Sequence, residues 1–238
     1  MAPASAFPNT LVTLAGQDKV CRTLGIKFIT SPELIYLARN ADFHALFIDL
    51  EHSSLSLETA SHLSVAAMNA GLSPFRVLDN GAMGVIVPHV DTVEQATAAV
   101  KAAKSTSISN VSSIGNSQLS TVIVMIESPE AVSNVDAIAA VEGVDVILVG
   151  TNDLSIELGV AGDFDHPDFV ESMEVIAAAV KKYGKILGVV GIYNRPDLLR
   201  HYIQNLGARF VVGQVDLPLV AKGVRQTAAE LISLETDI

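Results

Sequence analysis

Residues 121–153, TVIVMIESPEAVSNVDAIAAVEGVDVILVGTND, decide the fold class. Two short apolar runs rich in β-branched residues, at 121–126 and 144–149, stand at either end of a longer segment. That segment opens with Ser-Pro-Glu at 128–130, which supplies a helix cap, a proline at the first helical position and an acid in the first turn. Strands buried on both faces of a parallel sheet have this continuous apolar character. The stretch therefore predicts a strand, a crossover helix and a second, parallel strand.

The same alternation continues along the chain. Further strands are expected at about 24–29, 45–49, 84–88, 186–190 and 209–212, and further helices at 57–70, 91–104, 168–183, 195–206 and 217–234. Seven clear strands with the remnant of an eighth favour a (β/α)8 barrel over an open, doubly wound sheet. Residues 105–120 are small and polar without a helical period, and predict a long loop. We expect residues 1–238 to form a single domain.

Composition excludes several classes of protein. Half of the 238 residues are hydrophobic and 17% are charged, as in a packed globule. The net charge of -11 argues against nucleic acid as a partner. Cys21 stands alone, which fits a reducing compartment. Because neither a signal peptide nor a membrane-spanning run is visible, we expect a cytoplasmic protein without a membrane partner.

Acidic residues follow three of the predicted strands. They are found in Asp-Leu-Glu-His at 49–52, at Glu127 after VIVMI, and at Asp153 in GTND. Glu127 and Asp153 are one strand-helix unit apart, so they would meet at the same end of a barrel and could hold Mg²⁺ or Mn²⁺ together with water and substrate oxygens. The alternative that each carboxylate merely caps a helix stays open on spacing alone. His52, taken by itself, is more often a structural residue than a base.

Several motifs together carry a resemblance to a known family. FIDLEHSSLSLET, LDNGAMGVIVPHVDTVEQA, VIVMIESPEAVSNVDAIAAVEGVDVILVGTNDLS and ELGVAGDFDHP stand in the order found in the HpcH/HpaI aldolases, which are metal-dependent pyruvate aldolases. The chain resembles this family from about residue 24 to 235. The branches that it resembles most include 4-hydroxy-2-oxoacid aldolases, 2-keto-3-deoxy-sugar acid aldolases and a fungal oxaloacetate-decarboxylating relative.

The resemblance implies a fold, an assembly and a reaction. The fold is a TIM barrel of the phosphoenolpyruvate/pyruvate type, in a homo-oligomer that is a hexamer built as a trimer of dimers, with the last helix, about 217–234, exchanged between subunits. The reaction is aldol cleavage of a 4-hydroxy-2-oxoacid or decarboxylation of oxaloacetate through a pyruvate enolate. Glu127 and Asp153 match the family's ligands for a divalent metal, which is Mg²⁺ or Mn²⁺, with Co²⁺ as a further option.

Other site residues follow from the same resemblance. His52 matches the family's base and Asp79 of LDNGA matches the carboxylate that orients it. Asp49 and Glu51 would orient metal-bound water. Backbone N–H groups at a helix start would bind the substrate carboxylate, in Gly150, Thr151 and Asn152.

The chain departs from the family pattern around its third strand. Family members carry a substrate-binding Arg in a context such as P-F-V-R-V, whereas here Pro74-Phe75 runs directly into Arg76-Val77-Leu78-Asp79. Arg76 aligns with the basic residue before Leu-Asp instead of with the substrate-binding Arg. A second hypothesis is therefore a catalytically impaired barrel that serves as a ligand-binding or assembly protein.

Overall fold

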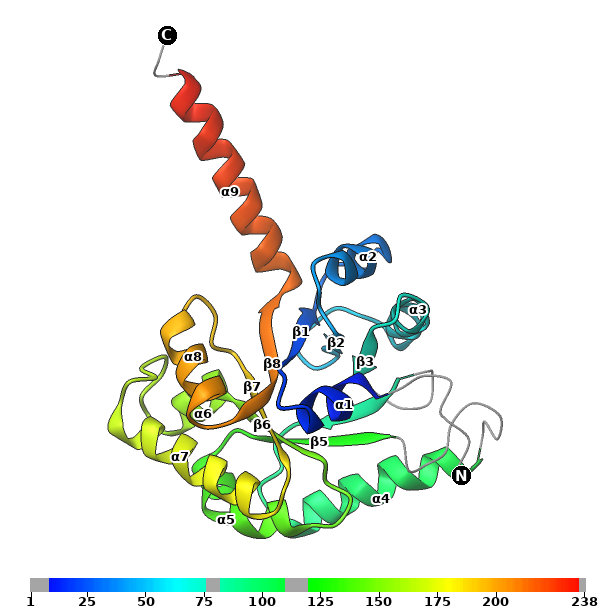
Figure 1. Cartoon of the computed structure of the whole chain (residues 1–238), viewed down its shortest axis with the longest axis vertical. Coiled ribbons are helices and arrows are strands. Elements are labelled where there is room, and N and C mark those ends of the chain that lie inside the picture. Colours follow the sequence, from blue (N-terminus) through cyan, green and yellow to red (C-terminus); the bar gives the residue numbers. More distant parts are fainter. Residues whose placement is uncertain (1–8, 76–81, 110–119, 236–238) are drawn as a thin grey trace.

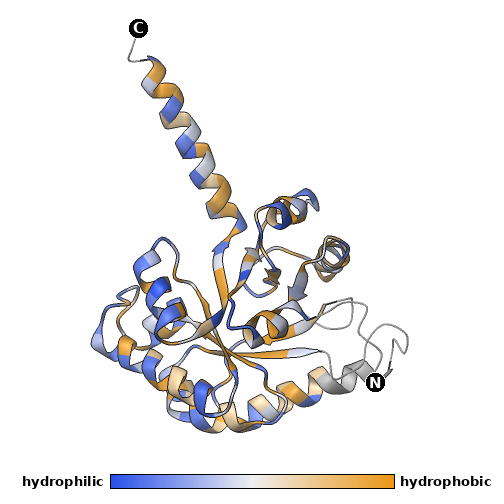
Figure 2. Ribbon diagram, viewed as in Figure 1, coloured by the Kyte–Doolittle hydropathy of each residue, from blue (hydrophilic) through white to orange (hydrophobic). Residues whose placement is uncertain are grey.

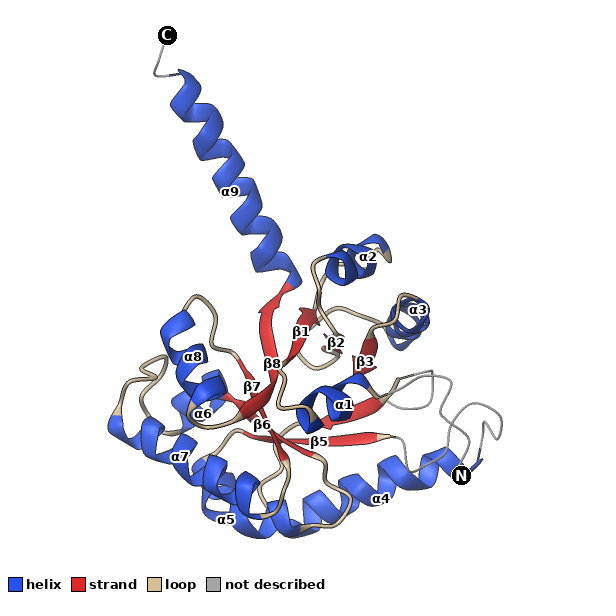
Figure 3. Ribbon diagram, in the orientation of Figure 1, coloured by secondary structure: helices blue, strands red, loops and turns tan. Residues whose placement is uncertain are grey.

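The structure is a computed structural model that describes residues 9–75, 82–109 and 120–235. Eight strands pair in parallel, each with the next, and β8 pairs with β1 to close a barrel. Helices lie around the outside of the closed barrel (Figures 1 and 3), which confirms the (β/α)8 fold and excludes the open sheet. They follow the strands other than β3, after which β4 is the next described element. The strands are β1 (Cys21–Ile26), β2 (Ala45–Ile48), β3 (Ser73–Phe75), β4 (Gly84–Val87), β5 (Thr121–Ile126), β6 (Val146–Gly150), β7 (Ile186–Val190) and β8 (Ala208–Val215).

The third strand is the one that the sequence left incomplete. β3 has three residues, all buried, and pairs with β2 over its whole length, whereas among the described residues it pairs with β4 only at Phe75 and Gly84. Its shortness explains the weak sequence signal, because three residues show no periodicity. Even so, β3 removes the two exposed sheet edges that a seven-stranded barrel would have.

The helices mostly follow the local signals. Ser128 caps α5 by accepting a hydrogen bond from the N–H of Ala131 (3.0 Å), as the Ser-Pro-Glu pattern predicts. The loop expected at 105–120 is wrong in its first part, since α4 runs on to Ser109, while residues 110–119 lie outside the described residues. Once α4 has formed, each added residue gains a helical hydrogen bond, so small polar residues extend it despite their weak propensity. The helices are α1 (Thr10–Gly16), α2 (Glu33–Asn40), α3 (Leu57–Asn69), α4 (Val93–Ser109), α5 (Pro129–Ala140), α6 (Thr151–Glu157), α7 (Pro167–Lys182), α8 (Pro196–Gln204) and α9 (Asp216–Glu235).

The barrel interior is a packed core that α1 closes at one end. Phe75 and Phe210 meet edge to face inside the barrel, with ring centroids 5.5 Å apart. Leu11 of α1 is fully buried against this core, and Asn9 donates a hydrogen bond to Thr121 at the start of β5. α1 therefore covers the N-terminal end of the strands, and leaves the C-terminal end for chemistry.

Helix α9 differs from the others because it leaves the barrel and projects away from it (Figure 1). Apolar and polar residues are interspersed along its length (Figure 2), and among its residues only Asp216 is buried. Its exposed large apolar side chains are Leu217, Leu219, Val220, Val224, Leu231, Ile232 and Leu234. Among the described residues, we find no helix whose length and apolar character would suit a membrane crossing.

Candidate active site at the C-terminal end of the barrel

Glu127 is a buried acid at this end of the barrel. It follows β5 directly and is only 4% exposed. Its Oε2 accepts a hydrogen bond from the backbone N–H of His89 (2.9 Å). Burial raises the pKa of Glu127, and the negative charges of Asp153 and Glu51 raise it further against the opposing effect of His89. The carboxyl group thus lies in a site of negative potential, where a cation would favour its ionised form.

The next strand is shaped to make room for this side chain. A Cβ on Gly150, the last residue of β6, would lie 2.4 Å from Oε1 of Glu127, so only glycine fits there. Asp153 follows in the first turn of α6, and its charge acts on Glu127. The two carboxylates that the sequence predicts as metal ligands therefore follow consecutive strands at the same end of the barrel.

The turn after β2 is held by Asp49. Its Oδ1 accepts hydrogen bonds from the backbone N–H groups of Glu51 (2.9 Å) and His52 (2.8 Å), and its Oδ2 lies 2.9 Å from Nζ of Lys27. Although burial acts to raise the pKa of Asp49, these hydrogen bonds and the Lys27 charge outweigh burial and lower it. Both oxygens of Asp49 are thus engaged by this turn and by Lys27.

Glu51 lies between two histidines. Its carboxylate oxygens are 3.9 Å from Nε2 of His52 and 3.7 Å from Nε2 of His89. The other ring nitrogen of His89, Nδ1, lies 3.6 Å from Oε2 of Glu127. A continuous line of polar side chains therefore runs from His52 through Glu51 and His89 to Glu127. Apart from Glu127, the side chains of this line are exposed, which leaves them open to a ligand.

Sequence reasoning assigned no role to His89 or to Lys27. The motif VPHV places His89 directly after a strand, and Lys27 interrupts the apolar run LGIKFI. Both features were visible signals. His89 also has a positive φ of 51°, a strained conformation that non-glycine residues adopt mostly at functional sites and turns.

The remaining predicted residues are divided between the described and undescribed parts. Thr151 and Asn152 donate side-chain hydrogen bonds to the carbonyl groups of Val190 (2.8 Å) and Gly191 (3.4 Å), which joins the start of α6 to the end of β7. The Asp79 expected to orient His52, and Arg76, lie outside the described residues.

The donor set fits a hard divalent cation. Within the described ranges, no cluster of three or more His, Cys, Asp or Glu side chains is arranged to hold a metal by itself. A pair of carboxylates completed by water and by substrate oxygens needs no third protein ligand. Glu127, which is buried, and Asp153, whose charge acts on it, have the oxygen donors that such a pair requires.

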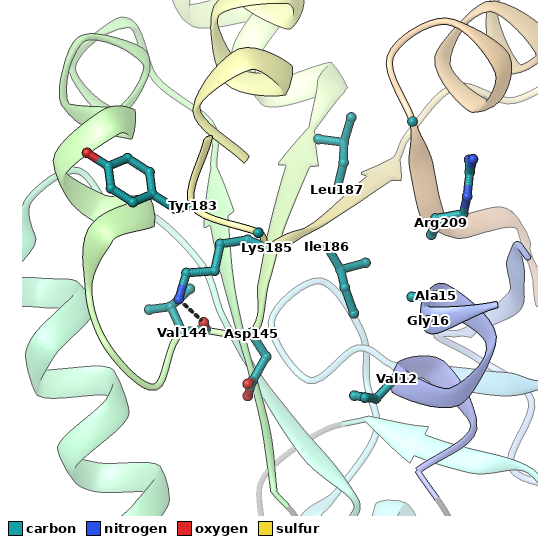
Figure 4. A pocket seen from close by; sticks show the side chains of 12 residues that line it. Val12, Ala15, Gly16, Val144, Asp145, Tyr183, Lys185, Ile186, Leu187 and Arg209 are labelled. Atoms are coloured by element: carbon teal, nitrogen blue, oxygen red, sulfur yellow. Dashed lines mark hydrogen bonds between the residues drawn. The ribbon is translucent and has the colours of Figure 1, made fainter. Parts of the chain in front are cut away.

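A cavity of about 440 Å³ lies at the opposite end of the barrel (Figure 4). It is lined by α1, by the segments before β6, β7 and β8, and by the first residues of β7 and β8. Its two basic side chains are already paired, since Lys185 donates to the carbonyl groups of Val141 and Val144, and Arg209 binds Asp18 and two carbonyl groups. We therefore place the chemistry at the C-terminal end.

A closed parallel barrel whose strand ends carry a buried carboxylate beside a second carboxylate and two histidines has the form of a barrel enzyme. The sequence profile of the HpcH/HpaI aldolase/citrate lyase family matches residues 63–222. The chain belongs to this family, and is an enzyme of its lyase class.

Relatives over the full length agree with this assignment. The chain is 39% identical to a 4-hydroxy-4-methyl-2-oxoglutarate aldolase, tasA, of Hapsidospora irregularis, covering 98% of both chains. It is 36% identical to a protein of the same description, cghB, of Chaetomium globosum, covering 95% of this chain and 96% of the relative. Among solved structures, a HpcH/HpaI aldolase/citrate lyase family protein from Burkholderia cenocepacia superposes with a TM-score of 0.81 at 25% identity. The superposition covers 93% of this chain and 98% of that structure.

Proposed function

We propose that this chain is a divalent-metal-dependent lyase that cleaves or forms a carbon–carbon bond through a pyruvate enolate. The observation that carries the proposal is the pair Glu127, directly after β5, and Asp153, in the first turn of the helix after the neighbouring strand β6, with the charge of Asp153 acting on Glu127. Mg²⁺ or Mn²⁺ suits these oxygen ligands. When bound, the cation supplies Lewis-acid stabilisation to the oxyanion that develops during cleavage.

The substrate is a small 2-oxoacid. The two fungal relatives are described as 4-hydroxy-4-methyl-2-oxoglutarate aldolases, which supports a 4-hydroxy-2-oxoacid as the substrate here, and oxaloacetate is the second candidate. Cleavage of either compound leaves the same three-carbon enolate.

The residues of the chain divide the work. The backbone N–H groups of residues 150–152, at the start of α6, bind the substrate carboxylate. His52 takes the proton from the substrate hydroxyl, and later returns a proton to the enolate carbon. Asp79 orients the ring of His52, and Glu51, which lies between His52 and His89, orients water at the metal.

The chelation of metal tests this proposal. Dialysis against EDTA should abolish pyruvate release from 4-hydroxy-4-methyl-2-oxoglutarate and from oxaloacetate, and added MnCl₂ should restore it. Glu127→Ala and Asp153→Ala should each lose Mn²⁺ binding and activity. Glu130→Ala, which changes an exposed acid three residues away, is the matched control and should remain active. Full activity after chelation contradicts the proposal.

A catalytically impaired descendant remains the second candidate, because one observation favours it. The alignment with the Hapsidospora relative runs over 264 positions, more than the 238 residues of this chain, so the chain lacks residues that the relative has. The departure from the family pattern at Pro74-Phe75-Arg76 is one place for such a gap. Mn²⁺ binding without turnover of either 2-oxoacid would support this candidate.

We also propose that the chain is a single aldolase-type barrel domain that assembles as a homo-oligomer in the cytoplasm. The projecting helix α9 presents apolar side chains along its length and packs on little of its own barrel. Exchange of α9 between subunits, in a hexamer built as a trimer of dimers, would bury those side chains. Light scattering on the purified protein measures the particle mass, and a monomer would contradict the assembly.

A further inference from the structure

We propose that Lys27 is a positioning residue that holds the Asp49–His52 turn, and that Asp216 at the start of α9 fixes Lys27 in place. The inference rests on the proposed function, because it takes His52 as the base. It adds a residue for which neither the strand-end pattern nor the family resemblance supplied a role.

The contact between Lys27 and Asp49 is the first support. Nζ of Lys27 lies 2.9 Å from Oδ2 of Asp49, and the two side chains are 25% and 7% exposed. A carboxylate this buried needs a compensating charge, since removing an unpaired ion from water is strongly unfavourable. Lys27 provides that charge from the segment directly after the adjacent strand, β1.

Asp49 in turn holds the backbone next to the base, His52. Its other oxygen, Oδ1, accepts the backbone N–H groups of Glu51 and His52, so the ionised carboxylate sets the path of the chain leading to the imidazole. The hydroxyl of Ser53 donates a further hydrogen bond (2.5 Å) to the carbonyl of Asp49. The ring of His52 is itself exposed, so the backbone of this turn determines from where the side chain extends.

Asp216 determines where Lys27 stands. Its Oδ2 accepts three successive backbone N–H groups, from Lys27 (3.2 Å), Phe28 (2.9 Å) and Ile29 (2.7 Å), and its Oδ1 accepts that of Leu217 (2.9 Å). Asp216 is 1% exposed and joins the end of β8 to the end of β1. The first residue of the projecting helix and the turn bearing His52 are thus linked by two carboxylates and one ammonium group.

Two other roles for Lys27 make different predictions. As a substrate ligand it would bind a carboxylate, and its loss would raise KM. As a nucleophile it would form a Schiff base with the 2-oxoacid, and its loss would abolish turnover whatever stands at position 49. A positioning role instead predicts a lower kcat at unchanged KM, and a dependence on Asp49.

Proton transfer by the base can be measured without a second substrate. The assay follows by NMR the exchange of pyruvate methyl protons for deuterium in D₂O that contains MnCl₂. The base removes one methyl proton, the electron pair enters the enolate, and the same carbon then takes a deuteron from the solvent-equilibrated base. Lys27→Met should lower kcat for exchange by about 10- to 100-fold, the usual effect of losing an outer positioning contact, with KM for pyruvate and Kd for Mn²⁺ within about 2-fold of wild type.

Three further variants make the test decisive. Lys27→Arg should restore most of kcat, because a guanidinium can pair with Asp49. The double variant Lys27→Met/Asp49→Asn should be faster than Lys27→Met, because the asparagine oxygen still accepts both N–H groups and needs no cation. Lys182→Met removes an exposed Lys–Asp pair (2.8 Å, with Asp136) between α7 and α5, and as the matched control should exchange like wild type.

The outcomes separate this inference from the proposed function. A wild-type protein that shows no Mn²⁺-dependent exchange refutes the proposed function. A wild-type protein that exchanges while Lys27→Met exchanges equally fast refutes the inference alone. A raised KM in Lys27→Met, or a double variant no faster than the single one, also refutes it in favour of a direct contact with substrate.

Discussion

Replacement of Gly150 by alanine is the sharpest test of the site geometry. The added Cβ would lie 2.4 Å from Oε1, 2.7 Å from Cγ and 3.0 Å from Cδ of Glu127. Gly150 has φ -81° and ψ 86°, and its φ is one that any residue adopts, so the effect of the substitution is steric. The Glu127 side chain must therefore move away from β6.

The cost can be worked out from the contacts that this movement breaks. Overpacking of a buried site costs about 1–3 kcal/mol. Moving the carboxylate also breaks its 2.9 Å hydrogen bond from the N–H of His89, and a hydrogen bond to a charged group is worth about 1.5–3 kcal/mol. Because the side chain can rotate to relieve part of this, we expect a loss of about 2–4 kcal/mol. For a chain of this size, each kcal/mol lowers Tm by about 2–4 °C.

Two measurements check the prediction. Thermal unfolding in EDTA should show the lower Tm, and Mn²⁺ titration by electron paramagnetic resonance should show an affinity reduced by at least about 10-fold. Gly213→Ala is the matched control, because Gly213 is an exposed strand glycine with nothing within 4 Å of the added Cβ. If Gly150→Ala unfolds and binds Mn²⁺ as wild type does, Glu127 does not pack against β6 and the reasoning fails.

Three further changes probe the charges and the projecting helix. The pKa of Glu127 in the folded chain is raised above 4.5, so the metal-free protein should lose stability as pH rises through that pKa, and Glu127→Gln should remove this loss. Thermal unfolding in EDTA at about pH 5 and about pH 8 measures the change in stability. The same pH dependence in the wild type and in Glu127→Gln would speak against a raised pKa. Asp216→Asn replaces an acceptor of four backbone N–H groups and should cost about 3 kcal/mol in urea unfolding while also slowing proton exchange; an unchanged midpoint would show that those hydrogen bonds contribute little. Ile232→Asp places a charge on the exposed apolar side of α9 and should reduce the particle mass in light scattering, whereas an unchanged mass would remove α9 from the assembly interface.

Much of the fold could be predicted from the sequence because its signals are local. The apolar runs of β5 and β6 and the Ser128 cap between them predict a parallel strand pair, and each of these signals spans only a few residues. The end of α4 was placed too early, because small polar residues that favour loops can also extend a helix already formed. The short β3 gave only a weak signal, since it forms by pairing with β2.

At the site, local sequence patterns are enough to predict which acids follow strands, and therefore that Glu127 and Asp153 share one end of a parallel barrel. The groups that surround these acids depend on contacts between distant parts of the chain. The N–H of His89 reaches Glu127 across 38 residues, and Asp216 reaches the end of β1 across 189. Such contacts depend on how the strands are staggered when the barrel closes, and no local pattern of residues records that stagger.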